Sequence, residues 1–195
     1  MRPVGEAEPP GIAASKPHAG FFWVYAPIQF DDHSMLVIVQ ERSDGTRVIQ
    51  EAVRVWADPA REPELLGQPE HEIEYVSGTR LARHARLTMT DVDGSPLVVE
   101  IEPLLSAFIG IGTGYGMEPD WRHGMHQGEL VVQGVHHDLT TDEGRARLWG
   151  IVDAVARFEI TSGTTAGAVG HGMFEHMNIG PYARYGFKDF LDPAP

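Results

Sequence analysis

Two Asp-Gly turns, each between runs of strand-forming residues, constrain the fold of this chain more than any other feature. MLVIVQE and TRVIQEAVRVW flank Ser43-Asp44-Gly45, and RLARHARLTMT and PLVVEIEP flank the turn from Asp91 to Gly94. Asp-Gly between two such runs is a strong hairpin signal, because Gly adopts the positive φ that tight hairpin turns need. The sequence therefore predicts at least two antiparallel β-hairpins.

The rest of the chain continues this pattern. Further strands are predicted in HEIEYVS, GELVVQGVHHDL, IVDAVARFEI and AGAVGHGMFEHMNIG. IVDAVARFEI also fits a helical stripe, but its neighbours favour a strand. Only TTDEGRARLW, residues 140–149, is typical of a short helix. No βαβ alternation is present, so we expect an all-β fold: an antiparallel barrel or sandwich of about nine or ten strands over residues 20–195. Residues 1–19, with four prolines, predict a flexible N-terminal arm.

The composition limits which partners the chain could bind and which cellular compartment we expect for it. The 195 residues carry 28 acidic and 15 basic side chains, a formal charge of −13, which argues against nucleic acid as a partner. The chain has no cysteine, which excludes disulfides and zinc sites built on sulfur. No run approaches the ~18 apolar residues of a membrane helix, and the first residues do not resemble a signal peptide. We expect a soluble cytoplasmic protein.

The segment GHGMFEHMNIGPYARYGF, residues 170–187, holds the main candidate site. On a strand, His171, Met173 and Glu175 point one way, while Phe174 and His176 point the other. We expect the first set to face a cavity, where Glu175 would be a buried acid of raised pKa with His171 as its hydrogen-bond partner. The alternative phase turns Phe174 and His176 inward and leaves Glu175 in water.

Three other clusters are weaker candidates. Asp31 and Asp32, in QFDDHS, suit a plain turn, or an acid of raised pKa at a barrel mouth. Trp121 and His123 lie in a Gly-rich stretch that predicts a lid over a pocket. GIGTGYG, residues 110–116, has the wrong glycine spacing for a phosphate loop and suits a barrel corner or the rim of a cavity. The ten histidines are scattered, so neither a metal nor another cofactor is expected.

Three segments together, APIQFDDHSMLVIVQE, GYGMEPDWRHGMHQGEL and GHGMFEHMNIGPYARYGF, resemble the lipocalin-like superfamily of carotenoid hydratases (hydroxyneurosporene synthases) and tocopherol cyclase-like proteins. The resemblance covers about residues 20–190. It implies a lipocalin-like barrel with a hydrophobic cavity and cofactor-independent chemistry on isoprenoid or polyketide-like substrates. Relatives usually carry two such domains, and this chain corresponds to one, the second of the pair. A single domain of this kind could bury the same face against its own copy, as a homodimer.

In the hydratases a carboxylic acid protonates a carbon–carbon double bond, and aromatic faces stabilise the cation. The chain offers residue types for both roles. The acids are Asp31, Asp32, Glu74, Glu102 and Glu175, and the candidate cavity walls are Phe22, Trp23, Tyr25, Trp121 and Phe174. We therefore expect a lyase or isomerase with Glu175, His171, Asp31 and Asp32 as candidate catalytic residues. Candidate ligand-binding residues are Trp23, Tyr25, Glu74, Trp121, His123, Met173, Phe174 and His176. The alternatives are a non-catalytic binding protein for hydrophobic ligands and a metal-dependent enzyme of the cupin kind.

Overall fold

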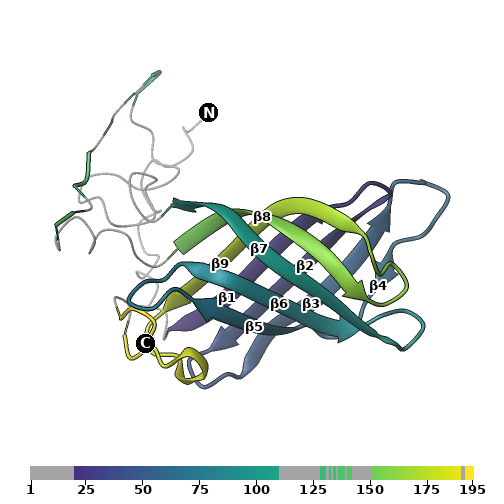
Figure 1. Ribbon diagram of the computed structural model, residues 1–195, viewed down its shortest axis with the longest axis horizontal. Helices are drawn as coiled ribbons and strands as arrows, with labels where there is room; N and C mark the ends of the chain where they lie inside the picture. Colours follow the sequence, from purple (N-terminus) through teal and green to yellow (C-terminus); the bar gives the residue numbers. More distant parts are fainter. Residues whose placement is uncertain are drawn as a thin grey trace, which may run out of the picture.

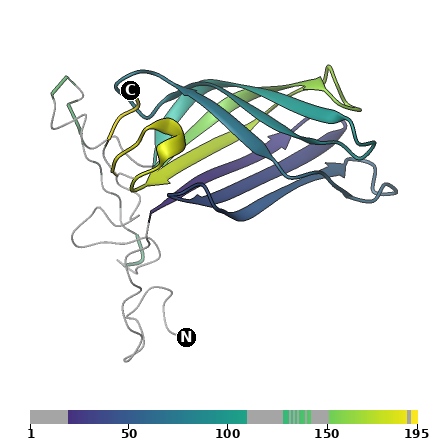
Figure 2. The same cartoon turned by 90° about the horizontal axis from the view of Figure 1, so that it is seen from below.

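The computed structural model describes residues 20–109, 128–130, 132, 134, 136–138, 140, 141, 151–189 and 192–195. Within these described residues, nine antiparallel strands form one sheet in the order β4-β3-β2-β1-β9-β8-β7-β6-β5. Their bounds are β1 Phe21–Gln29, β2 His33–Arg42, β3 Arg47–Trp56, β4 Glu64–Leu65, β5 Glu70–Tyr75, β6 Ala82–Thr90, β7 Pro96–Phe108, β8 Ile151–Ser162 and β9 Val169–Ile179. The sheet curls into a half-barrel (Figures 1 and 2). The predicted all-β, barrel-like antiparallel fold is confirmed.

Both predicted hairpins are present. β2 and β3 meet at a turn in which Gly45 has φ 83°, and β6 and β7 meet at one in which Gly94 has φ 85°. IVDAVARFEI is a strand, β8, as its neighbours predicted. The strands predicted at HEIEYVS and AGAVGHGMFEHMNIG are β5 and β9. The N-terminal arm and most of the helix predicted over 140–149 lie outside the described residues. For the strand predicted over 128–139, the described residues 128–130, 132, 134 and 136–138 belong to no strand, so the prediction is wrong for them.

Alternate side chains of each strand point into the curled sheet, and we call this side the inner face and the opposite side the outer face. The inner face is apolar and packed. Phe22, Phe158 and Phe174 have no exposed surface, and neither do Leu87, Val99 and Ile101. In β8 the alternation is regular, because Val152, Ala154, Ala156, Phe158 and Ile160 are all buried. Burial of this shared apolar face stabilises the fold at about 25 cal/mol for each Å² removed from water.

The alternation in β6 is broken once. Ala85, Leu87 and Met89 are buried, but near the start of the strand the buried residue is Ala82 rather than Leu81. The pairing between β5 and β6 shifts by one residue between Glu74 and Tyr75. Such a bulge reverses which side chains face the core beyond it, so the alternation changes phase at this end.

Glycines allow β9 to lie close to β1. A Cβ at Gly172 would meet the carbonyl oxygen of Pro27 at 2.1 Å, and one at Gly170 would meet that of Gln29 at 2.3 Å. Real Cβ atoms do not approach backbone so closely, so only Gly fits at these positions. The two glycines of the GHG sequence therefore have a packing role.

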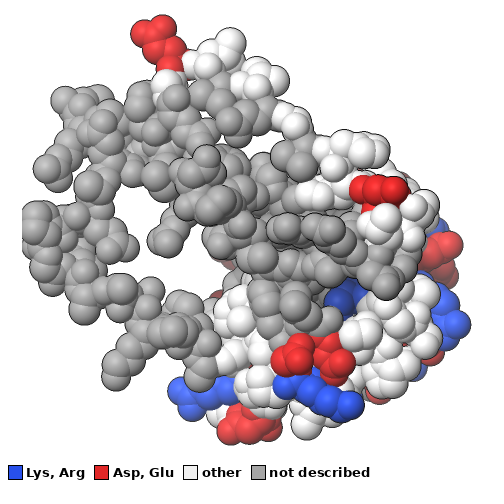
Figure 3. Space-filling view, turned by 90° about the vertical axis from the view of Figure 1, so that its left-hand side faces the viewer, with Lys and Arg blue, Asp and Glu red and all other residues white. Residues whose placement is uncertain are grey.

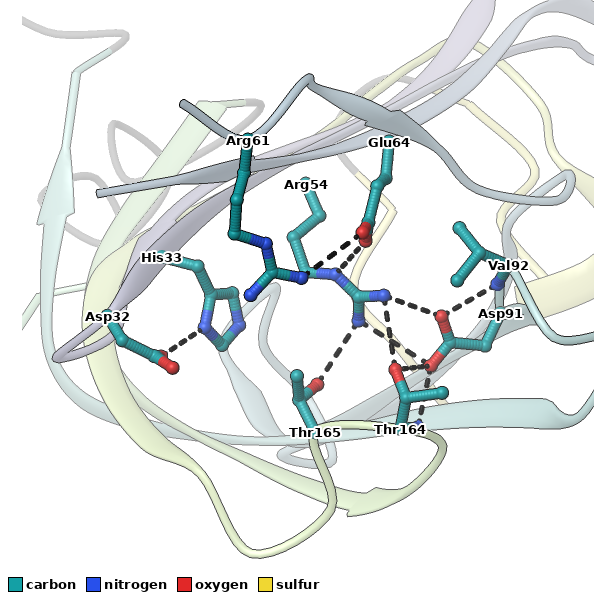
Figure 4. Close-up of polar contacts among 9 residues, drawn as sticks. All are labelled: Asp32, His33, Arg54, Arg61, Glu64, Asp91, Val92, Thr164 and Thr165. Carbon is teal, nitrogen blue, oxygen red and sulfur yellow. Dashed lines mark hydrogen bonds and ion pairs between the residues drawn. The ribbon is translucent and has the colours of Figure 1, made fainter. Parts of the chain in front are cut away.

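One end of the half-barrel is closed by a buried ion-pair cluster (Figure 4). Arg54 of β3 is fully buried, and its guanidinium donates to Asp91 in the β6–β7 turn, with Nη2 2.7 Å from Oδ1. Its Nε donates to Glu64 of β4 at 2.7 Å, and Thr164 and Thr165 of the β8–β9 turn accept at 3.2 Å. Four separate segments of chain are thus held together by one side chain.

The opposite end is covered by the C-terminal segment, which includes the 3₁₀ turn Ala183–Tyr185 (Figures 1 and 2). Phe22 is stacked between His71, 4.8 Å away, and Tyr182, 4.5 Å away. Buried Glu41 accepts hydrogen bonds from the Tyr182 hydroxyl and from Nε of Arg47. Burial works to raise the pKa of Glu41, but hydrogen bonds from His71 and Tyr182 outweigh it and lower the pKa.

Ion pairs continue at the surface of this end. Both Arg47 and Arg184 contact the carboxylate of Glu70, at 2.7 and 3.5 Å. In the view onto this end, acidic and basic side chains of the described residues lie side by side (Figure 3). These contacts hold the C-terminal segment against β3 and β5.

Candidate functional site

Two carboxyl groups lie next to each other on the outer face of the sheet. Glu175 of β9 is the direct cross-strand partner of Asp153 of β8, and on its other side it is the partner of Tyr25 of β1. Directly opposite residues in an antiparallel sheet have their side chains on the same face, about 5 Å apart at Cβ. Both carboxyl groups are half-buried.

Their surroundings keep protons on this carboxyl pair. Burial, and then the neighbouring Asp153 carboxyl, raise the pKa of Glu175 to about 7, while a hydrogen bond from Trp23 acts in the opposite direction. Burial also raises the pKa of Asp153, against a hydrogen bond from Glu175. Two adjacent carboxylates resist being ionised together, so the pair holds a proton near neutral pH.

Aromatic rings flank the carboxyl pair. The rings of Trp23 and Tyr25 lie side by side on β1, with centroids 6.3 Å apart and planes 23° from parallel. Met177, also on the outer face, is the cross-strand partner of Trp23. The carboxyl pair is therefore set in a largely apolar surface, which is the physical reason for its raised pKa values.

A groove of about 360 Å³ adjoins the carboxyl pair. Tyr25 lines the groove and is also the cross-strand partner of Glu175. The other lining residues come from β1, β2, β3 and β9 and are mostly apolar: Pro27, Ile28, Gln29, Ser34, Met35, Leu36, Val53, Val55, His171 and Gly172. An apolar groove with a few polar groups at its side is the usual form of a small-molecule site.

Five of the predicted site residues share the outer face around this groove. They are Trp23, Tyr25, His171, Met173 and Glu175. The grouping was predicted in part, because alternation alone places His171, Met173 and Glu175 together. The prediction that they face the inside of the barrel is wrong, since Phe174 and His176 occupy the inner face, 0% and 3% exposed.

The two inward residues belong to the core. Phe174 and Tyr75 contact the ring of His176, with centroids 5.3 and 5.4 Å away. Burial, and then the nearby Arg80, lower the pKa of His176 to about 3. His176 is therefore a neutral imidazole at physiological pH. His171, expected as the partner of Glu175, is exposed, and the carboxyl partner of Glu175 is Asp153 instead.

The remaining candidates lie elsewhere. Asp31 and Asp32 are exposed in the turn between β1 and β2, and a hydrogen bond with His33 at 2.7 Å lowers the pKa of Asp32. That is the opposite of the raised pKa expected of a proton donor. Glu74 is exposed on β5 and pairs with Arg83 at 3.0 Å, several strands from the carboxyl pair. Glu102 is exposed on β7. Trp121, His123 and the GIGTGYG run lie outside the described residues.

Asp153 was missed by sequence reasoning. Its only signal is a carboxylate in the middle of an alternating apolar run, on the phase opposite to the core. Among the described residues, no group of three or more His, Asp or Glu side chains is placed to hold a metal ion. In the same part of the chain, no helix has the length and apolar character needed to span a membrane.

Comparisons with known proteins identify the family of the chain. No match was found among curated proteins or among solved structures. Residues 1–188, almost the whole chain, match a family of unknown function, DUF8625. Since the match takes in every strand of the sheet and the carboxyl pair, the chain belongs to the family of unknown function DUF8625.

Proposed function

We propose that the protein binds a hydrophobic small molecule, isoprenoid or polyketide-like, in the groove on its outer face. We further propose that Glu175 donates a proton to this molecule in a cofactor-independent lyase or isomerase reaction of the hydratase or cyclase type. One observation carries the proposal: a carboxyl group with a pKa of about 7 lies beside Tyr25, which also lines an apolar groove.

The pKa determines which carboxyl group can donate a proton near pH 7. At pH 7 an ordinary glutamic acid of pKa near 4.5 is protonated in only about 0.3% of molecules, whereas Glu175 is protonated in about half. A general acid works best when its pKa lies near the working pH. Of the acids considered from the sequence, Glu175 is the one for which the surroundings produce this shift.

The chemistry balances without another reactant except water. The protonated carboxyl gives its proton to one carbon of a double bond and becomes a carboxylate. The faces of Trp23 and Tyr25 are placed to stabilise the positive charge on the other carbon. Addition of water, or loss of a neighbouring proton, then quenches the cation and returns a proton to the carboxylate.

Binding in the groove is the first prediction. We expect Nile red, an uncharged apolar fluorescent probe, to bind the folded protein and to bind Leu36→Arg at least about tenfold more weakly. Leu36 lines the groove, and an arginine there adds a charge that must be desolvated before the probe can enter. Leu65→Arg is the control, because Leu65 of β4 is 84% exposed and does not line the groove. Equal affinities in the two variants would place the site elsewhere.

The titration of Glu175 is the second prediction. We expect its carboxyl carbon to titrate near pH 7 by NMR, and to titrate at a lower pH in Asp153→Asn, where the neighbouring negative charge is gone. The folded-state pKa is raised above the unfolded value, so the stability contributed by this group is full below about pH 4.5 and is lost as pH rises through 7.

Glu175→Gln should accordingly raise the free energy of unfolding at pH 8 by about 1–2 kcal/mol, a figure reduced for partial exposure, and leave it nearly unchanged at pH 4. Chemical denaturation at the two pH values measures this difference. A Glu175 carboxyl that titrates below about pH 5 would remove it as the proton donor.

A non-catalytic binding protein is the second candidate, and the groove alone favours it. Once the bound molecule is known from native mass spectrometry of the purified protein, Glu175→Gln separates the two. An enzyme should keep binding and lose turnover, whereas a binding protein shows no turnover in either form.

A further inference from the structure

An apolar row crosses the outer face at right angles to the strands. The cross-strand partners run Val53–Leu36–Pro27 on one side and Met173–Val155–Leu105 on the other. Pro27 lies at the level of Met173, because Tyr25 pairs with Glu175 and Ile28 with Gly172. Val155 and Leu105 are 54% and 70% exposed, and the other four residues of the row are half-buried. A contiguous, partly exposed apolar surface of this kind is typical of an interaction site.

Acidic side chains lie on one side of this row, and an arginine and a histidine lie on the other. On one side, Glu175 of β9 is paired with Asp153 of β8. On the other side, two residues along each strand from the row, His171 of β9 is paired with Arg157 of β8. The acidic pair and the basic pair therefore lie at equal distances from Met173 and Val155. When a second copy is rotated by 180° about the row, its basic pair lies opposite the acidic pair of the first copy. The surface is therefore complementary to itself.

We propose that two copies of this chain associate through the outer faces of β1, β9 and β8, with the two-fold axis along the apolar row. Met173 and Val155 then face their own copies at the axis. The rotation brings Asp153 and Glu175 of one copy opposite Arg157 and His171 of the other. Each carboxyl pair gains a cationic partner from the second copy. The proposal stands on register and charge. The contact covers Glu175, so the proton donor of the proposed function is open to a ligand only in the free copy.

The geometry is that of two packed sheets. Because the two-fold axis runs across the strands, each strand of one copy faces an antiparallel strand of the other. Two aligned sheets pack about 10 Å apart, with their mean strand directions within about 30° of each other. Because the sheet curls away on both sides (Figure 2), the contact is confined to the three central strands. The part of the groove over β2 and β3 stays outside the contact. This interface is at the small end of the range for specific complexes, so we expect a reversible dimer.

The net charge of −13 on each copy opposes association at long range. At physiological salt this repulsion is screened over about 8 Å, whereas the facing charges are in direct contact. Arg157 already donates to Glu159 of its own strand at 2.9 Å, but both side chains of that pair are over one third exposed. Such an exposed pair costs little to rearrange.

Charge reversal tests the interface directly. By sedimentation equilibrium of the full chain, we expect Arg157→Asp and Asp153→Arg each to raise the dimer dissociation constant at least about tenfold, because each places like charges opposite one another. The double variant carries both changes and should recover most of the lost affinity, since opposite charges then face each other again. Arg83→Asp, a change of the same size at the 70% exposed Arg83 on β6, should have no effect.

A second measurement does not depend on the charge variants. The chain has no cysteine, so Met173→Cys introduces a single thiol at the expected axis. A thiol-to-thiol cross-linker that spans the roughly 10 Å between packed sheets should join two copies, and should not do so for Leu65→Cys. A wild-type chain that stays monomeric at its highest soluble concentration overturns the proposal. A dimer in which the double charge variant is no tighter than the single ones overturns this geometry.

Discussion

Replacing Arg54 with methionine is expected to lower the free energy of unfolding by about 3–5 kcal/mol. Arg54 is fully buried, and its guanidinium is the main cationic partner of Asp91, whose carboxylate is also buried. Methionine has a similar length but leaves the buried charge of Asp91 without its cationic partner. For a domain of this size the loss corresponds to a fall in Tm of roughly 10 °C, which chemical and thermal denaturation will measure.

The double variant Arg54→Met with Asp91→Leu is the matched control. It removes both charges, and exchange of a whole buried ion pair for apolar groups is often close to neutral. Recovery of about half or more of the lost stability is expected. If the single variant were as stable as the wild type, Arg54 would not hold the end of the half-barrel closed.

The pH dependence of the same cluster has a defined sign. Burial works to raise the pKa of Asp91, but hydrogen bonds from Arg54 and from the backbone of Thr164 outweigh it and lower the pKa to about 2. A carboxyl whose folded-state pKa is depressed contributes stability above its unfolded pKa of about 3.8 and loses it as pH falls toward 2. Arg54→Met removes the largest cause of the lowered pKa, so a large part of this acid-sensitive stability should be absent from the variant.

The strands and hairpins could be predicted from the sequence because their signals are local. Gly45 and Gly94 mark the turns by a backbone conformation that few other residues adopt. The alternation of Val152, Ala154, Ala156, Phe158 and Ile160 marks the buried face of β8 within a single run of residues. Neither inference depends on which strands are neighbours in the sheet.

The phase of β9 could not be predicted in the same way. Alternation groups His171, Met173 and Glu175 together, but the core lies on whichever face the neighbouring strands cover. The methionines and the acid on one side suit a pocket, whereas Phe174, with no exposed surface, is the residue that fills the core. A large aromatic side chain on one face is the better indicator of the side that is buried.

The partner of Glu175 depends on long-range register. Asp153 and Glu175 are 22 positions apart in the sequence, and the residues between them include the turn that sets the pairing of β8 with β9. A shift of one residue in that turn would place Val152 or Ala154 opposite Glu175 instead. Arg54 and Asp91 are further apart still and come from non-adjacent strands, so no sequence pattern indicates their contact.

His176→Phe is expected to remove most of the acid sensitivity of the fold between pH 6.5 and 3. Burial, and then Arg80, lower the pKa of His176 from 6.5 to about 3. Between pH 6.5 and 3, the imidazole of His176 is protonated in the unfolded chain but not in the folded protein. The free energy of unfolding is therefore highest above pH 6.5 and decreases as the pH falls. The full shift corresponds to about 4 kcal/mol at pH 3.

The aromatic replacement suits the site, because Phe174 and Tyr75 already contact the ring and Nε2 of His176 is a buried atom with no hydrogen-bond partner. At pH 7.5 we therefore expect His176→Phe to be at least as stable as the wild type. Chemical denaturation across the pH range gives the slope of the free energy of unfolding against pH for His176→Phe. The same measurement on His84→Phe, on the outer face of β6, is the control. Buried His71, whose pKa is also lowered by burial, keeps a smaller dependence of the same sign in both variants. A His176→Phe protein that loses stability with acid as steeply as the wild type would show that this ring is hydrated in solution and not part of a dry core.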